Sequence, residues 1–356
     1  MQRGRNVSKL TLQKVAELAG VSRSTVSRVV NHHPSVKPAV RQRVQKVIDE
    51  TGYHPDPAAR SLANQRSGII GLVIPRVFQS LFTDPYYPRL MQGISQACNT
   101  HNYILSLFLF HTEDEEQKLT AKLLRQQLVD GIILSALPAG DPLVPQLIGS
   151  QMPTVMIGRP LEAQAISYVD VSNVDGADEA VAHLLKLGRQ RIATITGPLN
   201  TTVGLDRRQG YRNALRNDDI AVDEALIVES DFTEAGGYQA ARQLLEHRPD
   251  AIFAASDPMA MGALRALRDA GRRVPDDIAI IGFDDLPFAA TAHPPLTTVR
   301  QPILRQGITA VEMLTDLLES GLRPTRQFTA PTELVIRQSC GANPKTHVDI
   351  DVNVRL

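Results

Sequence analysis

The chain has 356 residues, more than one hydrophobic core usually organises, so two or three domains are expected. Hydrophobic residues make up 43% of it and the mean hydropathy is −0.13, as in a soluble globular protein. A membrane helix needs about eighteen or more consecutive apolar residues without charge, and no stretch of the sequence approaches that length. Its two cysteines, Cys98 and Cys340, are far apart and lack the spacing of metal ligands, so we expect packing thiols and neither a zinc site nor a disulfide framework.

The formal net charge of zero hides a separation of charge along the chain. Residues 1–66 contain 12 Lys and Arg against 4 Asp and Glu, a net charge of +8, and the remainder carries −8. A basic segment attracts polyanions, and an acidic remainder keeps the rest of the protein from coating them. The basic N-terminus precedes a helical pattern rather than the apolar core of a signal peptide, so a cytoplasmic protein is expected.

The first predicted elements are two short helices. In TLQKVAELAG (residues 11–20), Thr11 is a candidate N-cap, and Gly20 stands where a helix would end. The apolar residues of this helix are Leu12, Val15, Ala16, Leu18 and Ala19. Ser22 can cap a second helix, whose buried stripe is Val26, Val29 and Val30. Two short helices joined by a tight turn that contains glycine are typical of a helix-turn-helix.

The second helix of such a motif enters the major groove of DNA with its N-terminal end, so its early exposed residues meet base edges. Here these are Arg23 and Ser24, with Arg28 one turn further along the outer face. An arginine can donate two hydrogen bonds to a guanine. The short hydroxyl side chains that suit phosphate oxygens are Ser22, Thr25 and Ser27. The alternative is a purely structural helical hairpin with exposed arginines.

A third helix is predicted from Pro38 to about Thr51, ended by Gly52. Its inner face would carry Val40, Val44, Val47 and Ile48. Two prolines then interrupt the chain, and residues 58–63 have room for about one and a half helical turns. Because so short a helix is marginal in isolation, we expect it to form only against DNA or a partner chain.

The segments TLQKVAELAGVSRSTVSRVVN and GYHPDPAARSLANQRSGIIGLVIP resemble the head and hinge of the lactose/galactose repressor family (LacI/GalR-type) of transcription regulators. The resemblance implies that two hinge helices pair across a dyad and insert Leu62, beside Ala59, into the minor groove of operator DNA, where an apolar wedge kinks the duplex. It also implies base reading by the second helix, with a DNA-binding set that extends to Asn31. Lys37 departs from the pattern, because the family's third helix usually opens with a Ser or Thr cap.

From Ser67 onward, apolar runs alternate with helical patterns. The runs with strand character are 68–75, 103–110, 131–137, 153–158, 191–197, 225–230, 251–256 and 278–283. Continuous apolar strands with helices between them indicate parallel sheets covered on both faces, and a series this long indicates two doubly wound α/β units. Ligands of such sheets bind beyond the carboxyl ends of the strands.

The resemblance covers essentially the whole chain and implies two lobes similar to periplasmic binding proteins, with an effector between them. We place three crossings between the lobes near 167–171, 297–302 and 328–331. The predicted organisation is a helix-turn-helix head (1–55), a hinge helix (56–66), an effector-binding and dimerisation core (67–343) and a C-terminal tail (344–356). Within the core, the N-lobe takes about 67–168 and 301–328, and the C-lobe about 169–300 and 329–343.

Recognition of a sugar needs planar hydrogen-bonding groups for its hydroxyls and aromatic faces for the C–H side of its ring. The resemblance implies such hydrogen bonds for Arg207, in the pattern R-x-x-G-Y, and for Asp284, Asp257 and Ser256, which follow apolar runs. Ser256 stands where the family usually has an asparagine. The other ligand positions that the resemblance implies are Tyr86, Tyr87, Arg159, Phe232 and Gln301. The alternative role is packing for the aromatic residues and lobe structure for Arg207 and Asp284.

The ligand class stays partly open. Thr201 and Val203 stand where purine-sensing members of the family carry an arginine and a threonine, which disfavours a nucleobase and leaves a sugar or a sugar phosphate. The run IGRP (residues 157–160) is similar to maltose-type regulators, over four residues only.

Two other protein classes are alternatives: an enzyme on the same two-lobed fold and a transport-type sugar-binding protein. The nucleotide-binding, hydrolase and metalloprotease motifs are absent from the sequence, and the adjacent Asp284 and Asp285 are expected to point apart. A DNA-binding head argues against transport. We therefore expect a transcription regulator, acting as a repressor, without cofactor or metal, which binds double-stranded operator DNA and a small-molecule effector. No leucine heptad is present at the C-terminus to hold a tetramer, so a homodimer is favoured.

Overall fold

The computed structural model describes residues 10–30, 33–53, 66–74, 84–110, 112–126, 128–135, 137–162, 164–321 and 325–342. The chain divides into two compact units, Met1–Gly68 and Ile69–Leu356. Several predictions fall outside the described residues: the hinge helix up to residue 65, the tail 344–356, and the DNA-binding candidates Asn31, Ala59 and Leu62.

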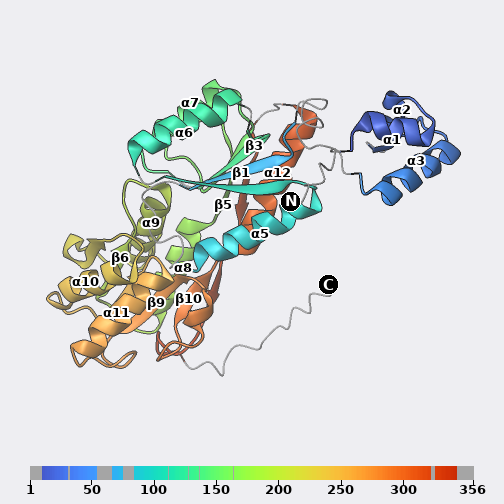
Figure 1. Cartoon of the computed structure of the whole chain (residues 1–356). Helices are drawn as coiled ribbons and strands as arrows, with labels where there is room; N and C mark the ends of the chain where they lie inside the picture. The colour runs from blue at the N-terminus through green and yellow to red at the C-terminus, as the bar shows by residue number, and fades with distance from the viewer. Residues whose placement is uncertain are drawn as a thin grey trace, which may run out of the picture. The chain divides into compact units, whose positions relative to one another are not determined.

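The described residues of the first unit form the helices α1 (Leu12–Ala19), α2 (Arg23–Val30) and α3 (Pro38–Thr51) (Figure 1). Their predicted boundaries are confirmed. The Thr11 hydroxyl accepts a hydrogen bond from the Lys14 amide at 3.3 Å, and Gly20 ends α1 with a φ of 61°, in the left-handed region that glycine enters without strain. Lys37 makes no side-chain capping bond to α3, as its departure from the family pattern predicts.

The three helices bury a small common core of Val15, Ala16, Ala19, Val26, Val29, Val44 and Tyr53. Of the apolar residues of α1, Val15, Ala16 and Ala19 are buried, whereas Leu18 is 54% exposed. The buried side of α1 follows positions 12, 15, 16 and 19, and residue 18 projects from a different side of the helix.

The N-lobe of the second unit is built on a six-stranded sheet in the order β11-β5-β4-β3-β1-β2, with every pair parallel. Its strands are β1 (Ile69–Ile74), β2 (Ile104–Leu109), β3 (Gly131–Ser135), β4 (Thr154–Ile157), β5 (Ser167–Val171) and β11 (Gln327–Ala330). Its helices are α5 (Tyr86–Thr100), α6 (Glu113–Gln126), α7 (Leu143–Gly149) and α12 (Ile303–Ser320).

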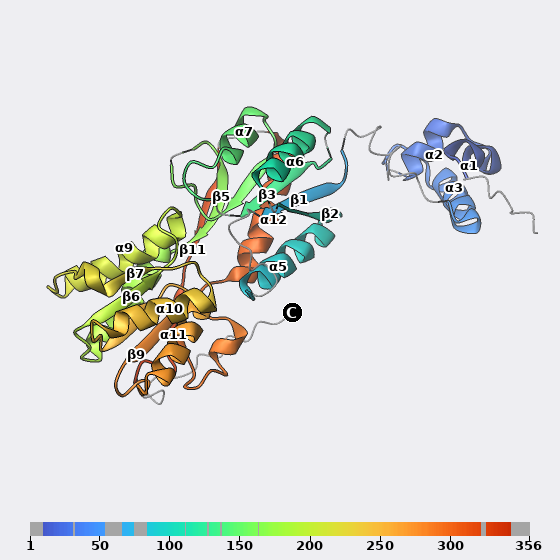
Figure 2. The same ribbon diagram turned by 60° about the vertical axis from the view of Figure 1, so that its left-hand side comes forward.

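Both faces of this sheet are covered, as Figures 1 and 2 show. Ile70 and Leu72 of β1 pack with α5 and α12 on one face, whereas Val73 packs with α6 and α7 on the other. Because side chains alternate between the two faces of a strand, a strand buried on both must be apolar at every position. The continuous apolar runs of the sequence have this cause.

The C-lobe repeats the arrangement with a sheet in the order β12-β10-β9-β8-β6-β7. Its strands are β6 (Ile192–Thr196), β7 (Ile227–Glu229), β8 (Ala251–Ala254), β9 (Ala279–Asp284), β10 (Thr297–Arg300) and β12 (Glu333–Val335). Helices α8 (Asn173–Lys186) and α9 (Thr202–Asn217) cover one face, and α10 (Glu234–Leu245) and α11 (Asp257–Asp269) cover the other (Figure 1). Strand β12 alone runs antiparallel to its neighbour.

The fold is therefore α/β, with an all-α head and two doubly wound lobes, as predicted. The chain passes between the two sheets three times, between β5 and α8, between β10 and α12, and between β11 and β12. Strands β5 and β11 extend the N-lobe sheet to Val171 and Ala330, a few residues beyond the boundaries expected from the sequence. None of the described helices is both long and apolar enough to cross a membrane.

Candidate functional site

Between the two lobes, at the carboxyl ends of both sheets, lies a cavity with about 730 Å³ of empty space, which includes the solvent at its mouth. Its walls come from the ends of strands and the residues just after them, as expected for doubly wound sheets, and from the N-terminal parts of α5, α9 and α12. The lining residues are Asp84, Tyr86, Tyr87, Ser135, Ile157, Gly158, Asp170, Val171, Asn173, Thr201, Val203, Arg207, Phe232, Ser256, Asp284, Gln301 and Gln306.

Arg207 is the buried centre of the C-lobe wall, with only 4% of the residue exposed. Its Nε donates to Asn173 Oδ1 at 2.9 Å, and its Nη1 donates to the Ala255 carbonyl at 2.5 Å and lies 3.5 Å from Asp284 Oδ1. The guanidinium carbon lies 3.6 Å from the centre of the Phe283 ring, in cation–π geometry. Burial lowers the pKa of Arg207, and the nearby Asp284 partly opposes this. Three fixed contacts and a stacked ring hold the guanidinium in one orientation.

Asp284 begins a chain of hydrogen bonds that runs from the C-lobe into the N-lobe. Gln301 Nε2 donates to Asp284 Oδ1 at 2.5 Å, and Gln306 Nε2, on α12, donates to Gln301 Oε1 at 2.9 Å. All three residues are buried. Burial raises the pKa of the Asp284 carboxyl to about 7, although Arg207 acts in the opposite direction. Such a chain holds polar atoms at fixed positions on the wall, where ligand hydroxyls can be recognised.

Aromatic rings form part of the same wall. Phe232 follows β7 with a φ of 64°, and its ring occupies the space where a side chain on Gly197 would begin. On the N-lobe side, the rings of Tyr86 and Tyr87 meet edge to face with centroids 5.4 Å apart. Burial raises the pKa of both tyrosines, so their hydroxyls remain protonated donors. Tyr86 and Phe232 are half-buried and Tyr87 is buried. Aromatic faces beside hydrogen-bonding groups suit a ligand with both C–H and hydroxyl surfaces.

Seven of the nine sequence-predicted effector residues line the cavity: Tyr86, Tyr87, Arg207, Phe232, Ser256, Asp284 and Gln301. Arg159 does not. Its Nη2 donates to Asp206 Oδ1 at 2.5 Å, and its carbonyl accepts from the Thr202 hydroxyl at 2.9 Å. Because Arg159 follows β4 of the N-lobe and both partners lie on α9 of the C-lobe, this placement favours a contact between lobes over the ligand contact that we expected.

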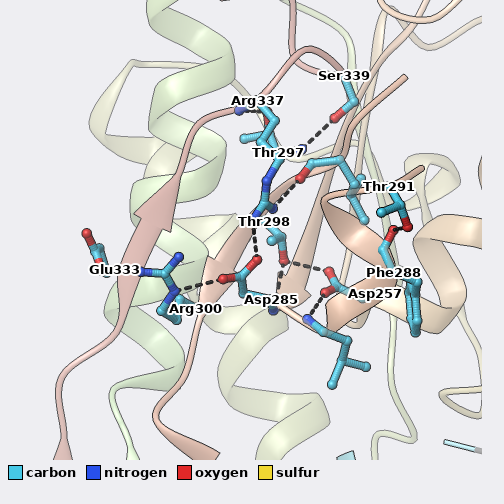
Figure 3. A network of polar contacts seen from close by, with 12 residues as sticks. Asp257, Asp285, Phe288, Thr291, Thr297, Thr298, Arg300, Glu333, Arg337 and Ser339 are labelled. Carbon is cyan, nitrogen blue, oxygen red and sulfur yellow. Dashed lines mark hydrogen bonds and ion pairs between the residues drawn. The ribbon is translucent and has the colours of Figure 1, made fainter. Parts of the chain in front are cut away.

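Asp257 does not line the cavity either. Its carboxylate accepts from the Thr298 hydroxyl at 2.5 Å and from the Leu286 amide at 2.8 Å (Figure 3). Leu286 in turn packs into the hydrophobic core of the N-lobe. The position of Asp257 favours a structural role, in which it holds the loop after β9 against the other lobe.

Asp284 and Asp285 do point to different partners, as predicted from their adjacency. Asp285 binds Arg300 Nε at 2.7 Å and Arg337 Nη2 at 2.7 Å (Figure 3), whereas Asp284 lines the cavity. The pair is therefore split between a structural ion-pair network and the candidate site.

The sequence did not identify several polar lining residues: Asp84, Ser135, Asp170, Asn173 and Gln306. Ser135 ends an apolar run, so the strand-end signal that indicated Asp284 was present for it too. Asp170 lies in β5, a stretch interpreted as a crossing, and Asn173 opens the following helix. Gln306 lies one turn inside α12 and carries no such signal.

The head carries the second candidate site, on α2. Arg23, Ser24 and Arg28 are exposed, as base-reading residues must be. The Ser22 hydroxyl accepts from the Thr25 amide at 3.1 Å, which confirms its predicted capping role, and it shares hydrogen bonds of 2.8 Å with the hydroxyls of Ser24 and Thr25. Ser27 is half-buried on the same helix. The capped end of α2 therefore presents hydroxyls beside two exposed arginines.

Neither site has the composition of a metal centre, and over the described ranges no three His, Cys, Asp or Glu residues gather in a way that could hold a metal ion. The hydrogen-bonding groups of the cavity are of the kind that bind a polar organic molecule.

Comparisons with known proteins identify both the head and the two-lobed core. Residues 11–56 match the family described as bacterial regulatory proteins, lacI family, and residues 181–340 match a periplasmic binding protein-like domain. The chain is 40% identical over 333 residues to the HTH-type transcriptional regulator CelR of Thermobifida fusca, an alignment that covers 92% of this chain and 98% of that protein.

Two solved structures are similar over almost the whole chain. A complex of the transcriptional regulator CelR with cellobiose superposes with a TM-score of 0.74 at 38% identity, covering 93% of this chain and 99% of that one. The lac repressor dimer bound to operator and an anti-inducer superposes with a TM-score of 0.81 at 29% identity, covering 94% and 100%. The chain therefore belongs to the lacI family of bacterial regulatory proteins and is a helix-turn-helix, DNA-binding transcription regulator with a periplasmic-binding-protein-like core.

Proposed function

We propose that this regulator represses transcription under the control of a sugar that binds in the cavity between its lobes. The observation that carries the proposal is the set of three buried and mutually fixed hydrogen-bonding groups, Arg207, Asp284 and Gln301, in a cavity that the ring of Phe232 also lines. Arg207 and Asp284 would bind a pair of sugar hydroxyls, and Phe232 would cover the C–H face of the ring. The similarity to a regulator solved with cellobiose supports a sugar as the ligand class.

On the DNA side, Arg23, Ser24 and Arg28 would read bases in the major groove, and Ser22, Thr25 and Ser27 would contact phosphates. The matched lacI-family head and the exposure of the two arginines support this assignment. Asn31, Ala59 and Leu62 stay predictions from the resemblance. We propose that the chain divides into a head (1–55), a hinge (56–66), a core (67–343) and a C-terminal tail (344–356).

We propose a homodimer because two heads related by a two-fold axis can read the two half-sites of a palindromic operator. The edge strand β2 supports it: Ile104 is 67% exposed and Leu107 is 38% exposed, and such apolar side chains favour burial against a partner. The similar lac repressor structure is a dimer on operator. Sedimentation of the full chain checks this assignment, and a monomer at micromolar concentration would contradict it.

Membership of a family of transcription regulators supports a function without catalysis. Because a bacterial repressor must bind operator DNA on the chromosome, we propose that the protein is located in the cytoplasm and associated with the nucleoid.

The test of the sugar proposal is Arg207→Ala. Removing a charged donor from a buried ligand contact costs about 1.5–3 kcal/mol, so sugar affinity should fall at least tenfold while operator affinity stays unchanged. Calorimetry with a panel of neutral sugars, cellobiose included, measures the first quantity, and operator titration measures the second and reports correct folding.

Arg208→Ala is the matched control. Arg208 is the next residue of α9, half-buried, and does not line the cavity. It should bind sugar and operator as the unmodified chain does. An Arg207→Ala protein whose operator binding responds at the same sugar concentration as that of the unmodified chain would remove Arg207 from the site.

A further inference from the structure

The charged residues of the cavity are unevenly divided between the two signs. Three carboxylates line it, those of Asp84, Asp170 and Asp284, whereas Arg207 is the one cationic side chain among the described lining residues. A ligand that brings its own negative charge therefore meets more repulsion than attraction.

Arg207 offers little to an anion because most of its donors are already used. Its Nε is taken by Asn173, and its Nη1 by the Ala255 carbonyl and Asp284. An arginine that binds a phosphate usually presents two parallel N–H groups to it. Here the Nη2 group remains for the ligand, which is enough for a hydroxyl but not for a bidentate phosphate contact.

The helix N-termini around the cavity would otherwise attract a phosphate, because their free amides and dipoles favour anions. Three of them are already occupied by side-chain oxygens. Asp84 Oδ1 accepts from the Tyr86 amide of α5 at 2.9 Å, the Thr201 hydroxyl accepts from Gly204 of α9 at 3.2 Å, and the Ser256 hydroxyl accepts from Met259 of α11 at 3.3 Å. A phosphate at any of these three termini would have to displace a cap, one of which is itself an anion. The N-terminus of α8 has no side-chain cap, but there Asp170 Oδ1 already accepts from the side chain of Asn173, the first residue of the helix, at 3.1 Å.

The next cation beyond the lining, Arg159, is also neutralised. Its Nη2 binds Asp206, and its Nε lies 3.7 Å from Asp170 Oδ2. Burial raises the pKa of both Asp84 and Asp170, a sign that negative charge is already costly here. A phosphate dianion beside these carboxylates would add to that cost, whereas sugar hydroxyls can donate to them.

We infer that the cavity takes an uncharged sugar and rejects the phosphorylated form of the same sugar, and that Asp84 and Asp170 are the residues that make this distinction. The inference rests on the proposed function, since it presumes that a sugar is bound. It resolves the choice between sugar and sugar phosphate that the sequence left open, and it assigns a role to two residues that the sequence did not identify.

The experiment is calorimetry of the full-length protein with matched pairs: cellobiose and cellobiose 6-phosphate, glucose and glucose 6-phosphate, ribose and ribose 5-phosphate. For whichever neutral sugar binds, its phosphate should bind at least about 100-fold more weakly, and inorganic phosphate at millimolar concentration should not compete. Asp84→Asn and Asp170→Asn each keep an oxygen acceptor but remove the charge, so each should reduce that ratio about tenfold. Asp276→Asn, which removes a carboxylate that pairs with Arg273 at an exposed site, is the control and should leave the ratio unchanged.

The outcomes distinguish failure of the selection against phosphate from failure of sugar binding itself. A phosphate that binds as tightly as its parent sugar overturns the inference and leaves the proposed function intact. A preserved 100-fold ratio in both Asn variants would show that the two carboxylates do not make the selection. If no sugar in either form binds, the proposed function fails, and this inference fails with it.

Discussion

Two residues of the candidate effector site have backbone conformations that are costly for any residue except glycine. Phe232 has a φ of 64° and Asp284 a φ of 122°. Such conformations cost on the order of 1–3 kcal/mol each and persist where the surroundings hold them for a function. Here one directs an aromatic ring and the other a carboxylate toward the same cavity, which supports their assignment to ligand binding.

The placement of the Phe232 ring depends on the absence of a side chain at Gly197. A Cβ there would lie 2.0 Å from the ring, so Gly197→Ala must displace it. We expect sugar affinity to fall about tenfold, because the stacking face moves, with operator affinity unchanged. Gly149→Ala is the control, since a Cβ at that helical position meets no atom within 4 Å. Calorimetry of both variants checks the prediction, and equal sugar affinities would argue against a ligand-facing ring.

The pKa of Asp284 makes a prediction for stability. Its pKa is about 7 in the folded chain against an ordinary value of 3.8, so the folded state holds this proton more tightly than the unfolded state does. The free energy of unfolding must then decrease as the pH rises from about 4 to 7 and level off above that. Asp284→Asn removes this loss, and it also relieves Asp257, whose pKa the Asp284 charge raises.

We therefore expect the difference in melting temperature between Asp284→Asn and the unmodified chain to shift by a few degrees in favour of the variant as the pH rises from 5 to 8. Thermal unfolding across that range measures the difference, with Asp276→Asn as a surface control. Parallel curves for the two proteins would mean that Asp284 titrates as an ordinary exposed carboxyl.

At the scale of elements, the lobes are joined by side-chain contacts as well as by the three chain crossings. Arg159, after β4, binds Asp206 on α9, and the Thr202 hydroxyl of α9 donates to the Arg159 carbonyl. A second contact is made by Leu286 of the C-lobe, which packs into the N-lobe core. Both contacts lie beside the cavity rather than in it, so they can influence how the lobes close on a ligand without touching it.

The Arg159–Asp206 pair is predicted to favour the arrangement of lobes seen here. Arg159→Ala and Asp206→Asn should each weaken sugar binding about threefold to tenfold, and the double variant should be no weaker than the worse single one, with a coupling energy of about 1 kcal/mol. The coupling energy is small because the Arg159 side chain is 40% exposed and solvent screens the ion pair. Arg212→Ala, which breaks an ion pair within the C-lobe, is the control. Additive losses would indicate that the two residues act independently.

At the scale of the whole molecule, the separation of charge assigns the two partners to different parts of the chain. Residues 1–66 carry a net charge of +8 and the remainder −8. In a dimer the two basic segments together carry about +16, and their phosphate contacts release counterions from DNA. The acidic remainder, by contrast, has no general attraction to DNA.

Operator affinity should therefore fall about 10³-fold or more between 50 and 200 mM salt, as for a protein with about six or more phosphate contacts. Sugar affinity should be almost constant over the same range, because an uncharged ligand releases no counterions. Operator titration and calorimetry at matched salt concentrations check both statements. A shallow salt dependence of operator binding would contradict a grip on the phosphate backbone.

The sequence alone determined the elements whose signal is local. The caps at Thr11 and Ser22, the helix ends at Gly20 and Gly52, and the buried apolar strands of both sheets follow from hydrogen bonding and side-chain periodicity within a few residues. The resemblance then assigned the family and seven residues of the cavity lining. Those that follow apolar strands come together because the carboxyl ends of parallel strands meet at one edge of a sheet.

Only the tertiary structure decided what depends on distant partners. Strands β5, β10, β11 and β12 carry mixed polar sequences and become strands through pairing with neighbours far along the chain. Asp257 and Asp284 both follow apolar strands, yet one holds a loop and the other faces the cavity, because a strand-end carboxylate points wherever its donors lie. For the same reason Arg159 binds Asp206 across the lobes. Asp84, Asp170 and Asp284 line the same cavity, because the folded chain brings together charges that the sequence keeps far apart.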